Sequence, residues 1–320
     1  MKTLKYKLRL KGLKTPDGTI AVKALKEISD LLLVCSERGL RLAIGGDSVK
    51  RGRLPAWLSD SLDLTVTGLE EGSTVLNIEA PFLGYTAKDQ IRQQDLWYTT
   101  PSPEDTVLTL MSKSVRDATT ENVNSDTYDA GILNGLLSFD PFLKDYAEGI
   151  ELRCRRRPRE QFELGPKELD KIHRLRIRTP EPIALVLSGL FNTIEHSRKR
   201  FQLVLSNDER IPGTIDPHFL DEEKMRQFWG KKVTVKGTVH FRPSRKVRLV
   251  EAEVIKPMEA GEEMFEKVSA TGSVRELFES YPLKQEARSF LTEIWGKWPG
   301  EESIEELLAA LKRPDPAGRG

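Results

Sequence analysis

The amino-acid sequence predicts an α+β protein with a mixed N-terminal α/β domain, a central five-stranded β-barrel and a C-terminal helical tail. Three patterns predict this: apolar and basic residues alternate over 4–11, five strand-like runs and one helix-like run fill 182–257, and an amphipathic, glutamate-rich pattern ends the chain. The 320 residues leave room for about two or three domains. We expect an α+β domain over 1–149, a basic linker with a short helix over 150–181, the barrel over 182–257 and an acidic helical tail over 258–320.

The composition fits a cytoplasmic protein. Hydrophobic residues make up 38% of the chain, which suffices for hydrophobic cores, yet no apolar run approaches the roughly 18 residues of a transmembrane helix. The N-terminus lacks the apolar segment of a secretion signal. The cysteines, Cys35 and Cys154, belong to no CxxC pair and no Cys/His cluster, which fits a reducing compartment.

The net charge of +1 is the sum of four blocks of opposite sign. Basic residues outnumber acidic ones by 13 to 5 in 1–53 and by 24 to 15 in 150–256. Acidic residues outnumber basic ones by 16 to 5 in 54–149 and by 13 to 8 in 257–320. This asymmetry indicates either surfaces that bind charged partners or neighbouring blocks that neutralise one another inside the fold.

The N-terminal domain begins with a clear strand signal, because Leu4, Tyr6, Leu8 and Leu10 alternate with basic residues. The basic face fits phosphate binding or an exposed edge strand that lysines protect from unwanted pairing, and we favour the edge strand. The other expected elements are a helix from Val22 capped by Gly39, a strand over 40–44, a hairpin over 62–66 and 73–80, and helices over 88–97, 104–118 (starting at Ser102) and 130–146.

Five arginines crowd the stretch that follows this domain: Arg153, Arg155, Arg156, Arg157 and Arg159. Arginine forms bidentate pairs with phosphates and carboxylates, so this density indicates contact with a polyanion or an acidic protein. The alternative is internal docking onto the acidic block just upstream. A short helix is expected over 166–174, before the linker dipeptide Thr179–Pro180.

The central stretch has the most ordered pattern in the chain. Strands are expected over 183–191, 201–205, 210–215, 231–242 and 246–257, with a helix over 219–229 between the third and fourth. Gly189 and Gly237 lie inside strands, where glycine permits the bulges and sharp coiling of a small closed barrel. In order and length of its elements the stretch resembles the OB fold.

OB barrels commonly bind oligonucleotides or oligosaccharides on the second and third strands and the flanking loops. The resemblance points to two basic clusters with aromatic neighbours as a nucleic-acid-binding face. These residues are Arg198, Lys199, Arg200 and Phe201 in the first cluster, and His240, Phe241, Arg242, Arg245, Lys246 and Arg248 in the second. The alternatives are that both phenylalanines belong to the core, and that the barrel docks a protein.

The tail ends in the phrase WPGEESIEELLAALKR, in which Ser303 and Glu306 form a capping box at the start of a helix. An apolar stripe follows, formed by Ile304, Leu307, Leu308 and Leu311. About 17 of the 320 residues take part in this pattern, which resembles the C-terminal end of small bacterial antitoxins encoded beside PIN-domain ribonuclease toxins.

This resemblance implies a bacterial toxin–antitoxin system in which a PIN-domain ribonuclease toxin is the protein partner. The partner would be bound by Trp298 and the apolar stripe in a helix-in-groove mode, and its acidic metal centre would receive Arg153, Arg155, Arg156 and Arg157. The alternative is that the tail helix packs on its own chain.

No motif for a phosphate-binding loop, a nucleophile elbow or a zinc-protease helix occurs in the sequence. Asp126 and Asp129 stand in a loop that fits either a divalent ion or ordinary turn chemistry, and we favour the turn. We therefore predict a protein without catalytic activity, metal or cofactor. The favoured function is an antitoxin-like regulator of a PIN-type ribonuclease, and the alternative is an OB-fold protein that binds single-stranded DNA or RNA.

Overall fold

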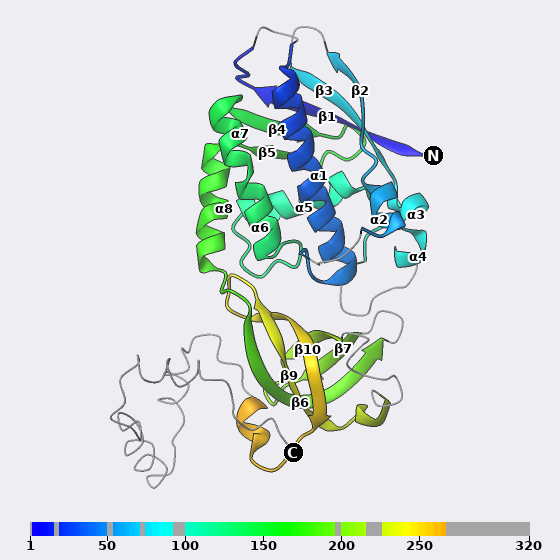
Figure 1. Cartoon of the computed structure of the whole chain (residues 1–320), viewed down its shortest axis with the longest axis vertical. Helices are drawn as coiled ribbons and strands as arrows, with labels where there is room; N and C mark the ends of the chain where they lie inside the picture. The colour runs from blue at the N-terminus through cyan, green and yellow to red at the C-terminus, as the bar shows by residue number, and fades with distance from the viewer. Residues whose placement is uncertain are drawn as a thin grey trace, which may run out of the picture. The chain divides into compact units, whose positions relative to one another are not determined.

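The computed structural model describes residues 2–15, 19–49, 54–70, 74–91, 100–195, 200–215 and 226–266 (Figure 1). The described residues all belong to the first of the two units into which the chain divides, residues 1–270. Within the described residues, the first unit has one hydrophobic core around an antiparallel sheet and another inside a closed barrel. Most of the predicted tail, from residue 267 onward, lies outside the described residues.

The sheet has five strands in the order β2-β3-β1-β4-β5. Their bounds are Thr3–Lys11 for β1, Thr65–Glu70 for β2, Val75–Pro81 for β3, Gly149–Arg153 for β4 and Phe162–Leu164 for β5. The predicted alternation in β1 is confirmed, since Leu4, Tyr6, Leu8 and Leu10 are buried in the core. The hairpin of β2 and β3 is also confirmed, with strand limits displaced by a few residues.

The prediction that β1 is an edge strand was wrong, because β1 is the central strand between β3 and β4. Its lysines have a different role, since glutamates of the other strands pair with them. Lys5 lies 3.2 Å from Glu79, and Lys7 lies 2.5 Å from Glu70. Lys11 lies 2.7 Å from a glutamate of β5. The basic face of β1 is thus largely neutralised within the sheet.

Helices pack their apolar faces together with the buried side of β1 in a single core (Figure 1). Their bounds are Val22–Gly45 for α1, Ala56–Ser61 for α2, Leu83–Thr86 for α3, Lys88–Ile91 for α4, Val107–Thr119 for α5, Ala130–Leu137 for α6, Phe139–Asp145 for α7 and Pro166–Arg178 for α8. Within the described part of the chain, no helix has the length and apolar character needed to cross a membrane.

The first helix is longer than predicted, and the strand expected over 40–44 does not form. The buried positions Ile28, Leu32 and Cys35 continue at helical spacing through Gly39 and Leu42, so the apolar face runs past the glycine. The helix ends at Gly46, whose φ of 80° is left-handed and whose N–H donates to the Leu42 carbonyl.

Two other helix limits differ from the predicted ones. The helix expected from Ser102 begins at Val107, because Thr106 and Thr109 form a capping box there. The Tyr6 hydroxyl reaches both threonines, at 2.7 and 2.9 Å, so the central strand fixes the start of α5. The helix expected over 130–146 is divided into α6 and α7 at Ser138.

The stretch expected to be a linker, 150–181, is built into the N-terminal core. In β4, Leu152 pairs with Leu8 of β1, and both side chains are buried. Helix α8 contributes Leu169, Ile172 and Leu175 to the same core. The arginine-rich segment therefore lies between two strands of the sheet, β4 and β5, rather than in an independent connection.

The predicted five-stranded barrel is confirmed. Its strands are β6 Ile183–Glu195, β7 Arg200–Val204, β8 Arg210–Ile215, β9 Lys232–Phe241 and β10 Val247–Pro257. They close in the order β10-β8-β7-β6-β9, with β8 and β10 parallel and the other neighbours antiparallel. This arrangement is compatible with the OB fold. Of the helix expected over 219–229, the structure describes the final residues, and 226–228 are helical.

Gly237 permits the close approach of β9 to β10. A Cβ atom there would lie 2.0 Å from the Glu251 carbonyl oxygen, which no side chain tolerates. The pairing of the two strands shifts next to this glycine, between Ala252 and Val254. Glycine in this strand therefore serves the bulge that the sequence predicts.

Two adjacent glycines test how α1 ends. Replacing Gly46 by alanine should lower the free energy of unfolding by about 1 kcal/mol, because its φ is +80°. Gly45→Ala is the matched control, since Gly45 belongs to the helix and a Cβ there would meet nothing within 4 Å. This control should stabilise the protein by roughly 0.5–1 kcal/mol. Chemical denaturation measures both, and equal effects would contradict the assigned end of α1.

Candidate partner-binding surface and barrel junction

The arginine-rich segment forms the turn between β4 and β5, and most of its guanidinium groups face solvent. Arg153, Arg155, Arg156 and Arg159 are exposed. Arg153 pairs with Glu151 at 2.6 Å. The other three side chains have no ion-pair partner among the described residues. We call Arg155, Arg156 and Arg159 the arginine patch.

Arg157 differs from the arginine patch because it anchors the turn to the protein. Its Nη1 lies 2.8 Å from Asp105, whose side chain is 3% exposed, and 3.1 Å from Glu160. Burial lowers the pKa of Arg157, but the hydrogen bond to Asp105 and the two carboxylate charges outweigh it, so the pKa is raised and the charge is secure. Lys113 approaches Asp105 from the other side at 3.0 Å.

An open groove of about 600 Å³ adjoins the arginine patch. Arg156 and Lys2 give it positive charge, and the Tyr85 ring, 54% exposed, gives it an accessible aromatic surface. Arginine and tyrosine are enriched where proteins bind other proteins. The remaining lining residues are Leu4, Phe82, Gly84, Pro103, Glu104 and Arg157.

The aromatic residues predicted for the barrel's nucleic-acid face lie in the barrel core. Phe201 is 1% exposed and Phe241 is 3% exposed. Phe201 stacks on Phe191 with their ring centroids 5.0 Å apart. Base stacking requires an accessible ring face. In this conformation neither ring offers one.

Two arginines of the predicted nucleic-acid face bind the C-terminal end of α1. Arg200 and Arg248 are 3% and 2% exposed. Arg200 donates to the Ile44 carbonyl, and Arg248 donates from Nη1 to the Gly46 carbonyl at 2.5 Å. The last carbonyls of a helix lack helical partners and carry partial negative charge, so buried cations stabilise this end.

A third arginine, Arg242, extends this contact. Its Nη2 lies 2.5 Å from Asp126, and its Nη1 donates to the Val247 carbonyl at 2.8 Å. Asp129, the other aspartate of this loop, caps α6 by accepting from the Ile132 N–H at 2.9 Å. Both aspartates are therefore engaged within the chain. Among the described residues, no group of three or more histidine, cysteine or acidic side chains is placed to hold a metal ion.

A half-buried acidic side chain, Asp47, follows the end of α1. Burial raises its pKa, a hydrogen bond from the Val49 N–H lowers it, and the nearby charges of Asp129 and Glu251 raise it again, leaving the pKa above its ordinary value. His240 lies at the same place, with its Nε2 3.4 Å from Glu251. We call the contact of the barrel with the end of α1 and the 126–129 loop the barrel junction.

The remaining predicted site residues have these positions. Arg245 and Lys246 are exposed at the tip of the β9–β10 hairpin. Arg198, Lys199, Trp298, Ile304, Leu307, Leu308 and Leu311 lie outside the described residues. The structure thus gathers Arg200, Arg242 and Arg248 at one junction, and leaves the arginine patch apart from it.

Sequence reasoning missed Asp105, Ile44 and Gly46 as partners of the arginines. Asp105 also accepts a hydrogen bond from the Ser102 N–H at 3.0 Å. The ion pair of Asp105 with Arg157 joins residues 52 positions apart in the sequence, and no local pattern predicts such a contact. Gly45–Gly46 was the one available signal, because a glycine pair after an apolar face marks a helix end.

Comparison of the chain with protein-family models, with curated proteins and with solved structures finds no match.

The anchoring role of Arg157 predicts a contrast with a neighbouring arginine. Arg157→Gln should lower the free energy of unfolding by about 2 kcal/mol, because it takes one cation away from the buried Asp105. Arg155→Gln, in the same turn but exposed, should stay within about 0.5 kcal/mol of the wild type. Urea denaturation measures the stability of the two variants, and equal stability would contradict the anchoring role of Arg157.

Arg200 provides the corresponding test of the barrel junction. Arg200→Met keeps the length and apolar part of the side chain but leaves the Ile44 carbonyl without its donor, at a cost of about 2 kcal/mol. Arg210→Met, at an exposed position of β8, should change stability by less than about 0.5 kcal/mol. Hydrogen exchange at the end of α1 should increase in Arg200→Met alone, and unchanged protection there would refute the contact.

Proposed function

We propose that this protein is a non-enzymatic, antitoxin-like regulator that binds an acidic protein partner, a PIN-type ribonuclease, through the arginine patch and the C-terminal tail. One observation carries the proposal: Arg155, Arg156 and Arg159 are exposed and have no ion-pair partner among the described residues, beside a groove with an accessible tyrosine. Arginine beside an accessible aromatic ring suits a carboxylate-rich protein surface.

The division of the arginines supports a protein partner over a nucleic acid. Of the barrel cations predicted to bind nucleic acid, Arg200, Arg242 and Arg248 bind the N-terminal part of the same chain. The two phenylalanines are in the core. This face of the barrel therefore contacts a protein surface, that of its own chain. Such a contact fits a protein-binding role better than nucleic-acid binding.

The chemistry of the cysteines also supports a binding role. Burial raises the pKa of the Cys35 thiol to about 12, so the thiol stays protonated near neutral pH and is a poor nucleophile. Cys154 is buried as well. The choice of a PIN-type ribonuclease rests on the antitoxin-like phrase at 298–313 alone, and that phrase supplies the apolar stripe of the proposed second contact.

Charge reversal of the arginine patch tests the proposal. The full chain is co-expressed with the product of the neighbouring reading frame, which we expect to be a PIN-domain protein. The triple variant Arg155→Glu, Arg156→Glu and Arg159→Glu should bind it at least about 100-fold more weakly, because each exposed attraction becomes a repulsion. A control variant with the same change of charge carries Arg210→Glu, Arg245→Glu and Lys246→Glu on the barrel, and should bind like the wild type.

The same assay separates the two proposed contacts and the two functions. Removing residues 299–320 should also abolish the complex, whereas an unaffected complex would exclude the tail. Equal loss in the patch variant and the barrel control would mean that net charge, not the arginine patch, governs binding. Tight binding of single-stranded DNA or RNA that falls steeply with salt would favour the nucleic-acid alternative instead.

A further inference from the structure

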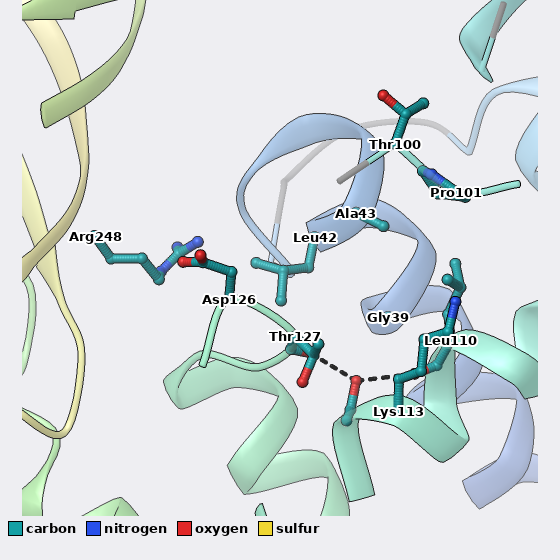
Figure 2. A pocket seen from close by; sticks show the side chains of 11 residues that line it. Gly39, Leu42, Ala43, Thr100, Pro101, Leu110, Lys113, Asp126, Thr127 and Arg248 are labelled. Carbon is teal, nitrogen blue, oxygen red and sulfur yellow. Dashed lines mark hydrogen bonds between the residues drawn. The ribbon is translucent and has the colours of Figure 1, made fainter. Parts of the chain in front are cut away.

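Arg248 contributes to a cavity of about 230 Å³ beside α1 and α5 (Figure 2). In Figure 2, Arg248 and Asp126 lie toward one side of this cavity and Thr100 and Pro101 toward the other. Arg248 is the largest side chain among those that are almost fully buried, at 2% exposure. The cavity therefore has a buried guanidinium in its wall.

The guanidinium of Arg248 is only partly satisfied by the protein. Its Nη1 donates to the Gly46 carbonyl at 2.5 Å. Within the described residues, its Nε and Nη2 have no hydrogen-bond partner. Buried donors are nearly always paired, and an unpaired one costs free energy. The Nε–H and Nη2–H groups lie on one edge of a guanidinium, so Arg248 retains a two-donor fork.

The nearest carboxylate cannot complete this fork. Asp129 Oδ2 lies 3.6 Å from Nη2, which is too long for a hydrogen bond. The carboxylate is held in place by other donors, namely Ser48 Oγ at 2.6 Å, the Ser48 N–H at 3.0 Å and the Ile132 N–H at 2.9 Å. Moving toward Arg248 would break these bonds and the cap of α6. Nη2 thus stays within ion-pair distance of Asp129, but neither Nε nor Nη2 has a hydrogen-bond acceptor among the described residues, and both suit an anion from outside the chain.

The charges around Arg248 indicate which side of it the anion occupies. A second cavity, of about 280 Å³, also borders Arg248, but Asp47, Asp129 and Glu251 line it and repel anions. The 230 Å³ cavity has a second cation, Lys113, which is itself paired with Asp105 at 3.0 Å. Its one acidic residue, Asp126, is paired with Arg242. An anion is therefore favoured in the 230 Å³ cavity.

We propose that this cavity binds a small carboxylate with a short, branched apolar body. A carboxylate presents two oxygens that match the two free donors of Arg248. Apolar walls for the body come from Leu42, Ala43, Pro101 and Leu110. Small-molecule sites combine mostly apolar walls with a few polar groups that fix orientation, as here. The site lies at the barrel junction, apart from the arginine patch, and does not depend on the proposed partner.

Isobutyrate is a suitable probe, with isobutyramide as its uncharged isostere. The wild-type protein should bind isobutyrate at least about tenfold more tightly than isobutyramide, because the amide lacks the charge that a bidentate pair with arginine needs. Binding is measured by NMR titration at constant ionic strength, with acetate and inorganic phosphate in parallel. Acetate should bind more weakly, since it lacks the branched body. Phosphate that binds as tightly as isobutyrate would overturn the assignment to a carboxylate.

Two variants locate the site. Ala43→Leu fills the cavity from α1 and should weaken isobutyrate binding at least about tenfold. Val34→Leu adds one carbon on an exposed position of the same helix and should bind like the wild type. Arg248→Met should abolish the preference for isobutyrate over isobutyramide. If Arg248→Met does not fold, Ala43→Leu alone decides, and undiminished binding in that folded variant would overturn the proposal.

Discussion

The end of α1 sets the main constraint on this structure, because its last carbonyls accept hydrogen bonds from two arginine side chains of the barrel that are buried. Arg200 and Arg248 donate to the carbonyls of Ile44 and Gly46. A buried guanidinium must find acceptors, and a helix C-terminus offers several with partial negative charge. The face of the barrel formed by the start of β7 and the β9–β10 hairpin is therefore committed to the N-terminal part of the chain. In an OB fold this region carries ligands, so its use for an internal contact determines which surfaces remain for a partner.

Acidic residues of 54–149 form ion pairs with some of the basic residues and not with others. The basic residues outside these pairs provide positive charge that a partner can bind. Asp105 pairs with Arg157, and Asp126 pairs with Arg242. Glutamates of the sheet pair with the lysines of β1. The arginine patch, Arg155, Arg156 and Arg159, stays outside this compensation because the turn between β4 and β5 holds it away from the core while Arg157 anchors the turn. A net charge of +1 therefore hides a local positive surface at the arginine patch.

Local patterns predicted most of the fold, and the errors arose where distant residues decide. Alternation in β1 and the order of the barrel elements follow from periods that the sequence displays directly. The position of β1 within the sheet does not, because Leu152, 144 residues away from its pairing partner Leu8, supplies the neighbouring strand. Gly39 looked like a helix end because glycine usually is one, but the apolar face of α1 continues past it. The roles of Arg200 and Arg248 were equally hidden, since their partners lie 156 and 202 residues away.

The buried arginines contribute specificity as well as stability. Desolvation of a guanidinium offsets part of the free energy that its hydrogen bonds contribute. Apolar side chains would not, however, select the carbonyl end of α1 over any other apolar surface. Arg248 illustrates the compromise, because the geometry that places Nη1 on Gly46 leaves Nε and Nη2 without acceptors among the described residues. Asp129 is already committed to capping α6. Arg248 therefore has two roles. Its hydrogen bond to the end of α1 orients the barrel, and the same geometry leaves Nε and Nη2 available as donors to an anion.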